Sequence, residues 1–170
     1  RGAVVSRDGM VTNAASGTIN FGGLDVLATR ALRADDFINN GTVNVNLNGA
    51  FDQNGGEYTN NSAINIASER SLNFGTDNVF NQDAGTLDNQ GTFALSNGTL
   101  NFNGGNFTGN ALDLTSSTLN ISATGSGAFN FRGTGNYSGD LAAGQTLTLF
   151  TAGGPNTDIT ATADFTNSGT

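Results

Sequence analysis

The carboxylates have the greatest scope for acid–base chemistry in this chain, because histidine and cysteine are absent and all six basic residues are arginines. Asp35 and Asp36 form the only adjacent acidic pair, shortly after Arg30 and Arg33. Paired carboxylates can act as acid and base on a sugar polymer when they face one groove. Ordinary charge contacts on a solvated segment explain the same spacing more simply. We therefore predict no catalytic residues, and expect Arg30, Arg33, Asp35 and Asp36 to mark at most a lateral binding segment.

Calcium is the metal to consider, because its ligands are oxygen atoms. The calcium-binding pattern Gly-Gly-x-Gly-x-Asp does not occur, since Gly55-Gly56 and Gly104-Gly105 lack the later Gly and Asp. Double glycines are explained more simply by tight turns with positive φ. The sequence therefore predicts no metal site and no cofactor.

Charge argues against a nucleic-acid partner, and the distribution of apolar residues argues against membrane insertion. The formal net charge is −8, and four of the six arginines fall within the first 33 residues. No basic stripe is available to neutralise phosphates, so we expect no nucleic-acid partner. No run of 18 apolar residues and no signal-peptide pattern occurs, so we expect no membrane insertion of this segment.

Asparagine and threonine are abundant, and stacked asparagines can form hydrogen-bonded ladders between successive coils. Six Asn-x-Ser/Thr sequons occur, a number that this composition gives by chance, so ladders or turns are the simpler use and glycosylation is the alternative. The sequons begin at Asn40, Asn60, Asn97, Asn106, Asn120 and Asn136. Threonine-rich stretches near the carboxyl end do not keep the regular Thr-x-Thr register that an ice-binding face needs.

Internal repeats indicate the elements that carry these side chains. A tetrad of Thr/Ser, apolar, Asn and apolar residues begins at Thr18, Thr42, Ser71, Thr99 and Thr118, at intervals of 24, 29, 28 and 19 residues. The alternation of apolar and polar residues is typical of short strands with one buried face. Between two inward apolar neighbours, Asn44, Asn73 and Asn101 are predicted to point outward.

Residues 42–66 align without a gap onto residues 71–95, which predicts that Phe51 and Phe80 are equivalent core residues stacked in adjacent coils. A segment at 24–36 lacks Gly and Asn and places Leu24, Leu27 and Ala31 on one helical face. We expect a short helical or loop excursion there.

These patterns predict an all-β, right-handed parallel β-helix, or β-solenoid, of about six coils of 19–29 residues that forms one segment over 1–170. A sandwich or a propeller also has short strands, but a sandwich needs no similarity between successive units and propeller blades are longer. Two or three strands per coil both remain compatible with the sequence.

Residues 136–149, Asn-Tyr-Ser-Gly-Asp-Leu-Ala-Ala-Gly-Gln-Thr-Leu-Thr-Leu, resemble the passenger-associated strand repeat of bacterial autotransporters, with a shorter version at 105–114. An aromatic-x-Asn-x-Gly/Ser-Thr/Ala pattern at 37–42, 58–63 and 165–170, with Leu87 replacing the aromatic at 87–92, is similar to filamentous haemagglutinin-like adhesins. The resemblance implies a right-handed parallel β-helix, export through an outer-membrane pore, and adhesion, biofilm formation or surface display. It carries no catalytic residues. The secretion motifs and membrane barrel of such exoproteins are missing from the sequence.

The expected function is thus a structural or adhesive extracellular rod of a large secreted surface protein, of which this chain is expected to be an excerpt. The alternatives are a self-assembling filament or matrix subunit and, with less support, a carbohydrate-active β-helix of the lyase or tailspike type. Expected partners are other copies of the chain, through end-to-end or lateral strand stacking, and surface glycans or proteins.

Overall fold

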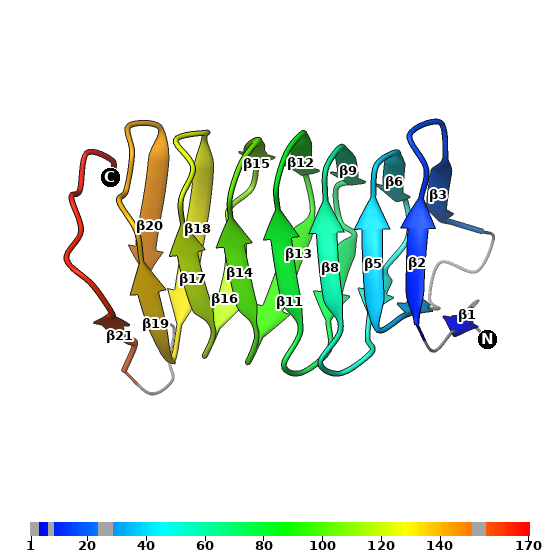
Figure 1. Ribbon diagram of the computed structural model, residues 1–170. Helices are drawn as coiled ribbons and strands as arrows, with labels where there is room; N and C mark the ends of the chain where they lie inside the picture. Colours follow the sequence, from blue (N-terminus) through cyan, green and yellow to red (C-terminus); the bar gives the residue numbers. More distant parts are fainter. Residues whose placement is uncertain (1–3, 7–8, 24–28, 151–155) are drawn as a thin grey trace.

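The computed structural model describes residues 4–6, 9–23, 29–150 and 156–170. These residues form a rod in which the chain winds from one end to the other (Figure 1). The rod contains 21 strands, the shortest of three residues and the longest of six. Within the described ranges there is no helix, and so none long and apolar enough to cross a membrane.

The strands form three parallel sheets, here called A, B and C. Sheet A contains β1 (Val4–Ser6), β4 (Arg30–Arg33), β7 (Gly49–Phe51), β10 (Ser71–Phe74), β13 (Thr92–Ser96), β16 (Leu112–Thr115), β18 (Gly127–Arg132) and β20 (Gln145–Leu149). Sheet B contains β2 (Met10–Asn13), β5 (Asp36–Asn39), β8 (Glu57–Asn60), β11 (Val79–Gln82), β14 (Thr99–Phe102), β17 (Thr118–Ile121), β19 (Thr134–Ser138) and β21 (Asp158–Ala161). Sheet C contains β3 (Thr18–Phe21), β6 (Thr42–Val45), β9 (Ala63–Ile66), β12 (Thr86–Asn89) and β15 (Asn106–Gly109).

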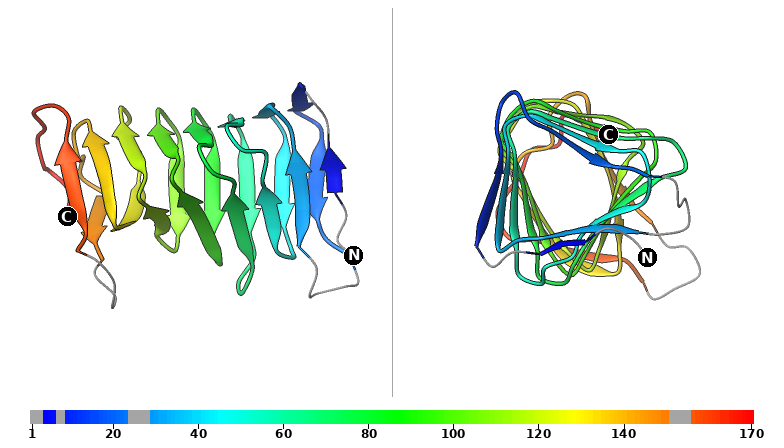
Figure 2. Two further views of the ribbon diagram at one scale, coloured as in Figure 1. Left: turned by 90° about the horizontal axis from the view of Figure 1, so that it is seen from below. Right: turned by 90° about the vertical axis from the view of Figure 1, so that its right-hand side faces the viewer.

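The predicted β-solenoid is therefore confirmed, with about six turns. Every third strand returns to the same sheet as far as β15, which gives three strands per coil and the three-sided outline seen along the rod (Figure 2). Residues that stack in adjacent coils are 26, 21 and 22 positions apart early in the chain, and 20, 19 and 18 later. Turns of variable length absorb these differences, so the strands keep their register.

The core is a continuous column of side chains that point into the rod. On sheet B the pairing places Phe37, Tyr58, Phe80 and Leu100 in successive coils, and all four are buried. Phe51 of sheet A stacks on Tyr58 with 4.7 Å between ring centroids. Because strands this short bury little by themselves, stacking of coils supplies the apolar contact that stabilises them.

The equivalence predicted between Phe51 and Phe80 is wrong. Both side chains are buried, but Phe51 pairs with Leu32 and Phe74 in sheet A, whereas Phe80 pairs with Tyr58 and Leu100 in sheet B. The alignment shifts the chain by 29 residues, which is one coil and the strand of one further face. It therefore superimposes strands that belong to different sheets. All three faces use the same alternation, and the alignment could not distinguish them.

The helical alternative for residues 24–36 is wrong for its described part, while residues 24–28 lie outside the described residues. Residues 30–33 form β4, and Asp36 begins β5. Arg30 and Leu32 are buried, whereas Ala31 and Arg33 are partly exposed. This period of two allows β4 to pair in parallel with β1 and β7, which a helix could not do.

A column of left-handed residues turns the chain at the corner between sheets A and B. Asp77, Asn97 and Ser116 have φ of 61°, 51° and 49°, and Gly55 and Gly133 have φ of 72°. The Asp77 amide donates to the Asn97 carbonyl at 3.0 Å, and the amides of Gly55, Asn97 and Ser116 each donate to the residue before the next member of the column. Gly, Asn and Asp tolerate this conformation better than other residues, which explains part of the unusual composition.

Burial raises the pKa of Tyr58 to about 12, and the charges of Asp52 and Asp35 act in the same direction. The folded state thus holds the phenolic proton more tightly than the unfolded chain, whose tyrosine titrates near 10. Burial also raises the pKa of Tyr137. Since the chain has no lysine, histidine or cysteine, the tyrosines dominate titration between these values.

We predict that the free energy of unfolding falls as pH rises from 10 towards 12. The stabilisation from neutral Tyr58 is fully present below pH 10, the pKa of tyrosine in the unfolded chain, and it is lost as pH rises through the pKa of about 12 in the folded state. The expected loss for Tyr58 is on the order of 2–3 kcal/mol. Denaturant titrations across this range should show that Tyr58→Phe removes most of the dependence. A slope unchanged in Tyr58→Phe and in Tyr137→Phe would contradict the burial of these hydroxyls.

Candidate functional site

The four residues proposed as a lateral binding segment do not converge on one site. Arg30 is buried, and its Nε donates to the Gly22 carbonyl at 3.1 Å. Arg33 pairs with Asp52 one coil away, with 2.8 Å between Nη2 and Oδ2. Asp35 is exposed and accepts a hydrogen bond from the Gly9 amide at 2.8 Å. Each of these three side chains therefore has a partner outside the proposed group.

Asp36, the fourth residue, lies beside a carboxylate that the sequence did not suggest. It pairs in sheet B with Glu57 of the next coil, and both side chains are exposed. Glu57 Oε1 accepts a hydrogen bond from Asn81 Nδ2 at 2.7 Å. In the described ranges, here included, no three acidic side chains gather into a group suited to a metal ion.

The outer surface of sheet B carries a hydrogen-bonded ladder of amides. Asn101 Nδ2 donates to Asn81 Oδ1 at 2.7 Å, and Asn120 Nδ2 donates to Asn101 Oδ1 at 2.8 Å. Ser138 extends the ladder to the next coil. On sheet C, Asn44 takes part in a similar ladder, and on sheet A Asn73 is exposed. The predicted outward orientation of Asn44, Asn73 and Asn101 and the predicted ladders are confirmed.

A second ladder lies inside the corner between sheets B and C. Asn13 Nδ2 donates to Asn39 Oδ1, Asn39 Nδ2 to Asn60 Oδ1, and Asn60 Nδ2 to Gln82 Oε1, at 2.8, 2.8 and 2.9 Å. Asn39 and Asn60 are the asparagines of the recurrent aromatic-x-Asn pattern, so the sequence held a signal for this ladder. Their burial was not predicted, because alternation alone does not show where a strand enters a corner.

Burial separates the six sequons into different classes. Asn60 is fully buried, and its amide nitrogen is used in the corner ladder. Asn120 donates its amide to Asn101. By contrast, Asn97, Asn106 and Asn136 are exposed. Modification of Asn60 would break the corner ladder, so the sequon pattern alone overstates the number of accessible sites.

An apolar cavity of about 290 Å³ lies at the carboxyl end of the rod. Leu147, Leu149 and Ile159 line it, and they occupy the same register as the inward residues Phe129, Phe131 and Gly135 of the preceding coil. The cavity is therefore the interior of the solenoid in its last described coil, and it carries no separate catalytic group.

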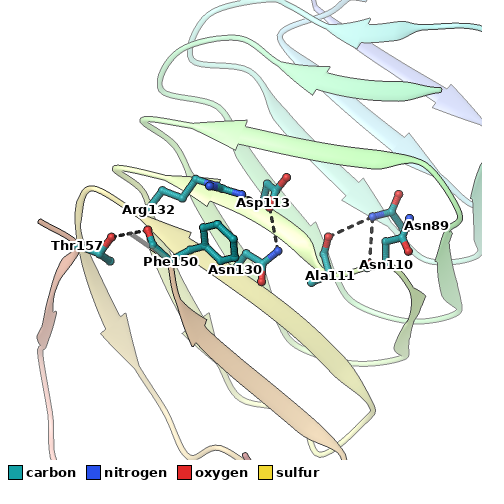
Figure 3. A network of polar contacts seen from close by, with 8 residues as sticks. All are labelled: Asn89, Asn110, Ala111, Asp113, Asn130, Arg132, Phe150 and Thr157. Carbon is teal, nitrogen blue, oxygen red and sulfur yellow. Dashed lines mark hydrogen bonds and ion pairs between the residues drawn. The ribbon is translucent and has the colours of Figure 1, made fainter. Parts of the chain in front are cut away.

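A charged and aromatic cluster lies on the outer edge of sheet A, where three coils meet (Figure 3). Arg132 ends β18, and its guanidinium carbon lies 4.2 Å from the centroid of the Phe150 ring. Arg132 Nη2 is 3.7 Å from Asp113 Oδ1, an atom that also accepts a hydrogen bond from Asn130 Nδ2 at 3.0 Å. These residues, here called the Arg132 cluster, bring a cation, a carboxylate, an amide and an exposed ring together. Sequence reasoning missed them because they come from different coils.

Comparisons with family models, with characterised proteins and with solved structures found no match to this chain.

We predict that the two types of asparagine ladder differ in their contribution to stability. Asn60→Ala should lower the free energy of unfolding by roughly 1–3 kcal/mol, because it removes the side-chain donor to the buried Gln82 Oε1 and one of the two acceptors of Asn39 Nδ2, which keeps the Ala63 carbonyl. Asn65→Ala, in the adjacent strand β9 and also in a ladder, should change it by about 0.5 kcal/mol or less, because Asn65 is exposed. Denaturant unfolding of both variants checks this, and equal losses would show that burial does not distinguish the ladders.

Proposed function

We propose that the chain is a structural and adhesive rod of a secreted protein displayed at a cell surface. The observation that supports this is the unbroken parallel pairing of eight strands in each of sheets A and B. Such stacking fixes each coil to its neighbours, so the molecule spans a distance and presents long faces. Adhesion then depends on the side chains of those outer faces, as is common for groups carried on a regular scaffold.

The extracellular part of the proposal is supported by the way in which residues 136–149 fit the fold. Tyr137 is buried on β19 and Leu147 lies on β20, while Gly139 and Gly144 between them have φ of 99° and 87°. The aromatic residue, the two glycines and the alternating leucines thus coincide with a strand, a turn and a strand. This correspondence is what an exported autotransporter passenger repeat would require.

The proposal includes no catalytic step. Hydrolysis of a polysaccharide needs two carboxylates with distinct roles around one bond. Asp36 and Glu57 lie side by side on the outer face of sheet B, and both are exposed to solvent instead of facing each other across a groove. Release of reducing ends from polysaccharides by the purified chain would overturn this part of the proposal.

We predict that antibodies raised against the chain label intact cells that produce it, because the proposed rod is displayed outside the cell. External protease should remove the label, while a cytoplasmic marker protein in the same cells stays intact as the control for membrane integrity. Labelling that appears only after lysis would contradict the proposed location.

A further inference from the structure

The Arg132 cluster contains the only cation in a long acidic part of the chain. Residues 71–170 contain seven aspartates and a single arginine, Arg132. Its side chain is 36 % exposed, and that of Asp113 is 32 % exposed. Phe150, which follows β20, is 41 % exposed although it is a large apolar residue. A cation and an aromatic ring therefore share one solvent-accessible position in a part of the chain whose other charged side chains are all negative.

Within the described residues, the contacts of Arg132 position its guanidinium and leave N–H donors unused. The guanidinium carbon lies over the Phe150 ring, 4.2 Å from its centroid, and this cation–π contact restricts where the guanidinium can lie. The 3.7 Å separation from Asp113 exceeds the 2.7–2.9 Å that is typical of a charge-assisted hydrogen bond. Among the described residues, Asp113 thus attracts the guanidinium but forms no short hydrogen bond with it, so N–H donors of Arg132 stay available to a ligand.

Further polar groups continue from Arg132 along the outer face of sheet A. The strand register places Thr115 beside Arg132 in the preceding coil, and Ser96 beside Thr115 in the coil before that. Adjacent strands are about 4.8 Å apart, so hydroxyl groups follow the cation at short, regular intervals. A ligand that lies along the rod from Phe150 would meet an aromatic ring, a cation and then hydroxyls.

We propose that the Arg132 cluster binds a carboxylate-bearing sugar residue of a glycan. The guanidinium matches the fork of a carboxylate, and Phe150 offers an apolar surface to the C–H face of a sugar ring. Asp113, Asn130 and Thr115 supply acceptors and donors for sugar hydroxyls. Asp113 also disfavours densely charged ligands, because a single cation beside a carboxylate cannot neutralise several phosphates or sulfates.

The inference rests on the proposed function for its biological setting, a glycan met outside the cell. Binding itself can be measured on the purified chain, so the two can fail separately. A chain that is displayed at the surface and does not bind sugar acids would overturn the site alone. A chain that binds them and is found only inside the cell would overturn the proposed function alone.

The test is calorimetric titration of the 170-residue chain with oligosaccharides that contain glucuronate, galacturonate or sialic acid. Each probe is compared with its counterpart in which the carboxyl group has been reduced to an alcohol. At least one acidic probe should bind, and its reduced counterpart should bind at least about tenfold more weakly, the effect expected from loss of a hydrogen bond to a charged group. Probes that carry the acidic sugar at the end of the oligosaccharide are compared with probes that carry it at an internal position, which shows which of the two positions the cluster accepts.

Variants assign the binding to the cluster. Arg132→Gln should lower affinity by about 10- to 100-fold, Arg132→Lys should not restore it fully, and Phe150→Ala should weaken it. Arg70→Gln is the matched control, because it removes the same charge in the turn before β10, away from the cluster, and should leave affinity unchanged. Thermal unfolding confirms that each variant is folded. Failure of every acidic probe to bind, equal binding of reduced probes, unchanged affinity in Arg132→Gln, or an equal loss in Arg70→Gln would each overturn the proposal.

Discussion

Parallel pairing between successive coils is the constraint on which the rest of this structure depends. Strands of three to six residues bury too little surface to be stable alone, so each strand is held by its equivalents in the coils before and after it. Pairing in register places residues of the same type next to each other in successive coils. Apolar residues then form the core column and asparagines form ladders, and both follow from the same repeat.

The corners show how the fold tolerates irregular coils without losing this register. Coil length varies between 18 and 26 residues where ladder partners define it, yet strands of one sheet remain paired throughout. Left-handed residues such as Asn97 and Ser116 turn the chain sharply, and the buried amides of Asn39 and Asn60 bond to the next coil instead of to water. Polar groups inside the corner are therefore satisfied by stacking, which makes them sensitive to any change of register.

Much of the fold followed from the sequence, because alternation and repetition predict stacked short strands directly. The outward asparagines were also predictable, since each lies between two apolar neighbours. The face to which each strand belongs was not, because the same tetrad occurs on sheet C at Thr18, on sheet A at Ser71 and on sheet B at Thr99. The Arg132 cluster was beyond reach for a related reason: its members become neighbours only when the number of residues in each turn is known.

The register of the coils determines both the rod and the cluster on its face. The absence of cysteine makes disulfide trapping a direct measurement, because paired positions on neighbouring strands lie within the distance that a disulfide spans. Asn44 and Asn65 are outward partners in sheet C, with 2.9 Å between the Asn65 Nδ2 donor and Asn44 Oδ1. The three-sided register predicts that Asn44→Cys with Asn65→Cys forms an intramolecular disulfide on mild oxidation, detected by mass spectrometry, and that Asn44→Cys with Asn73→Cys does not. A disulfide in the second pair and none in the first would contradict the three-sided register and support the 29-residue repeat instead.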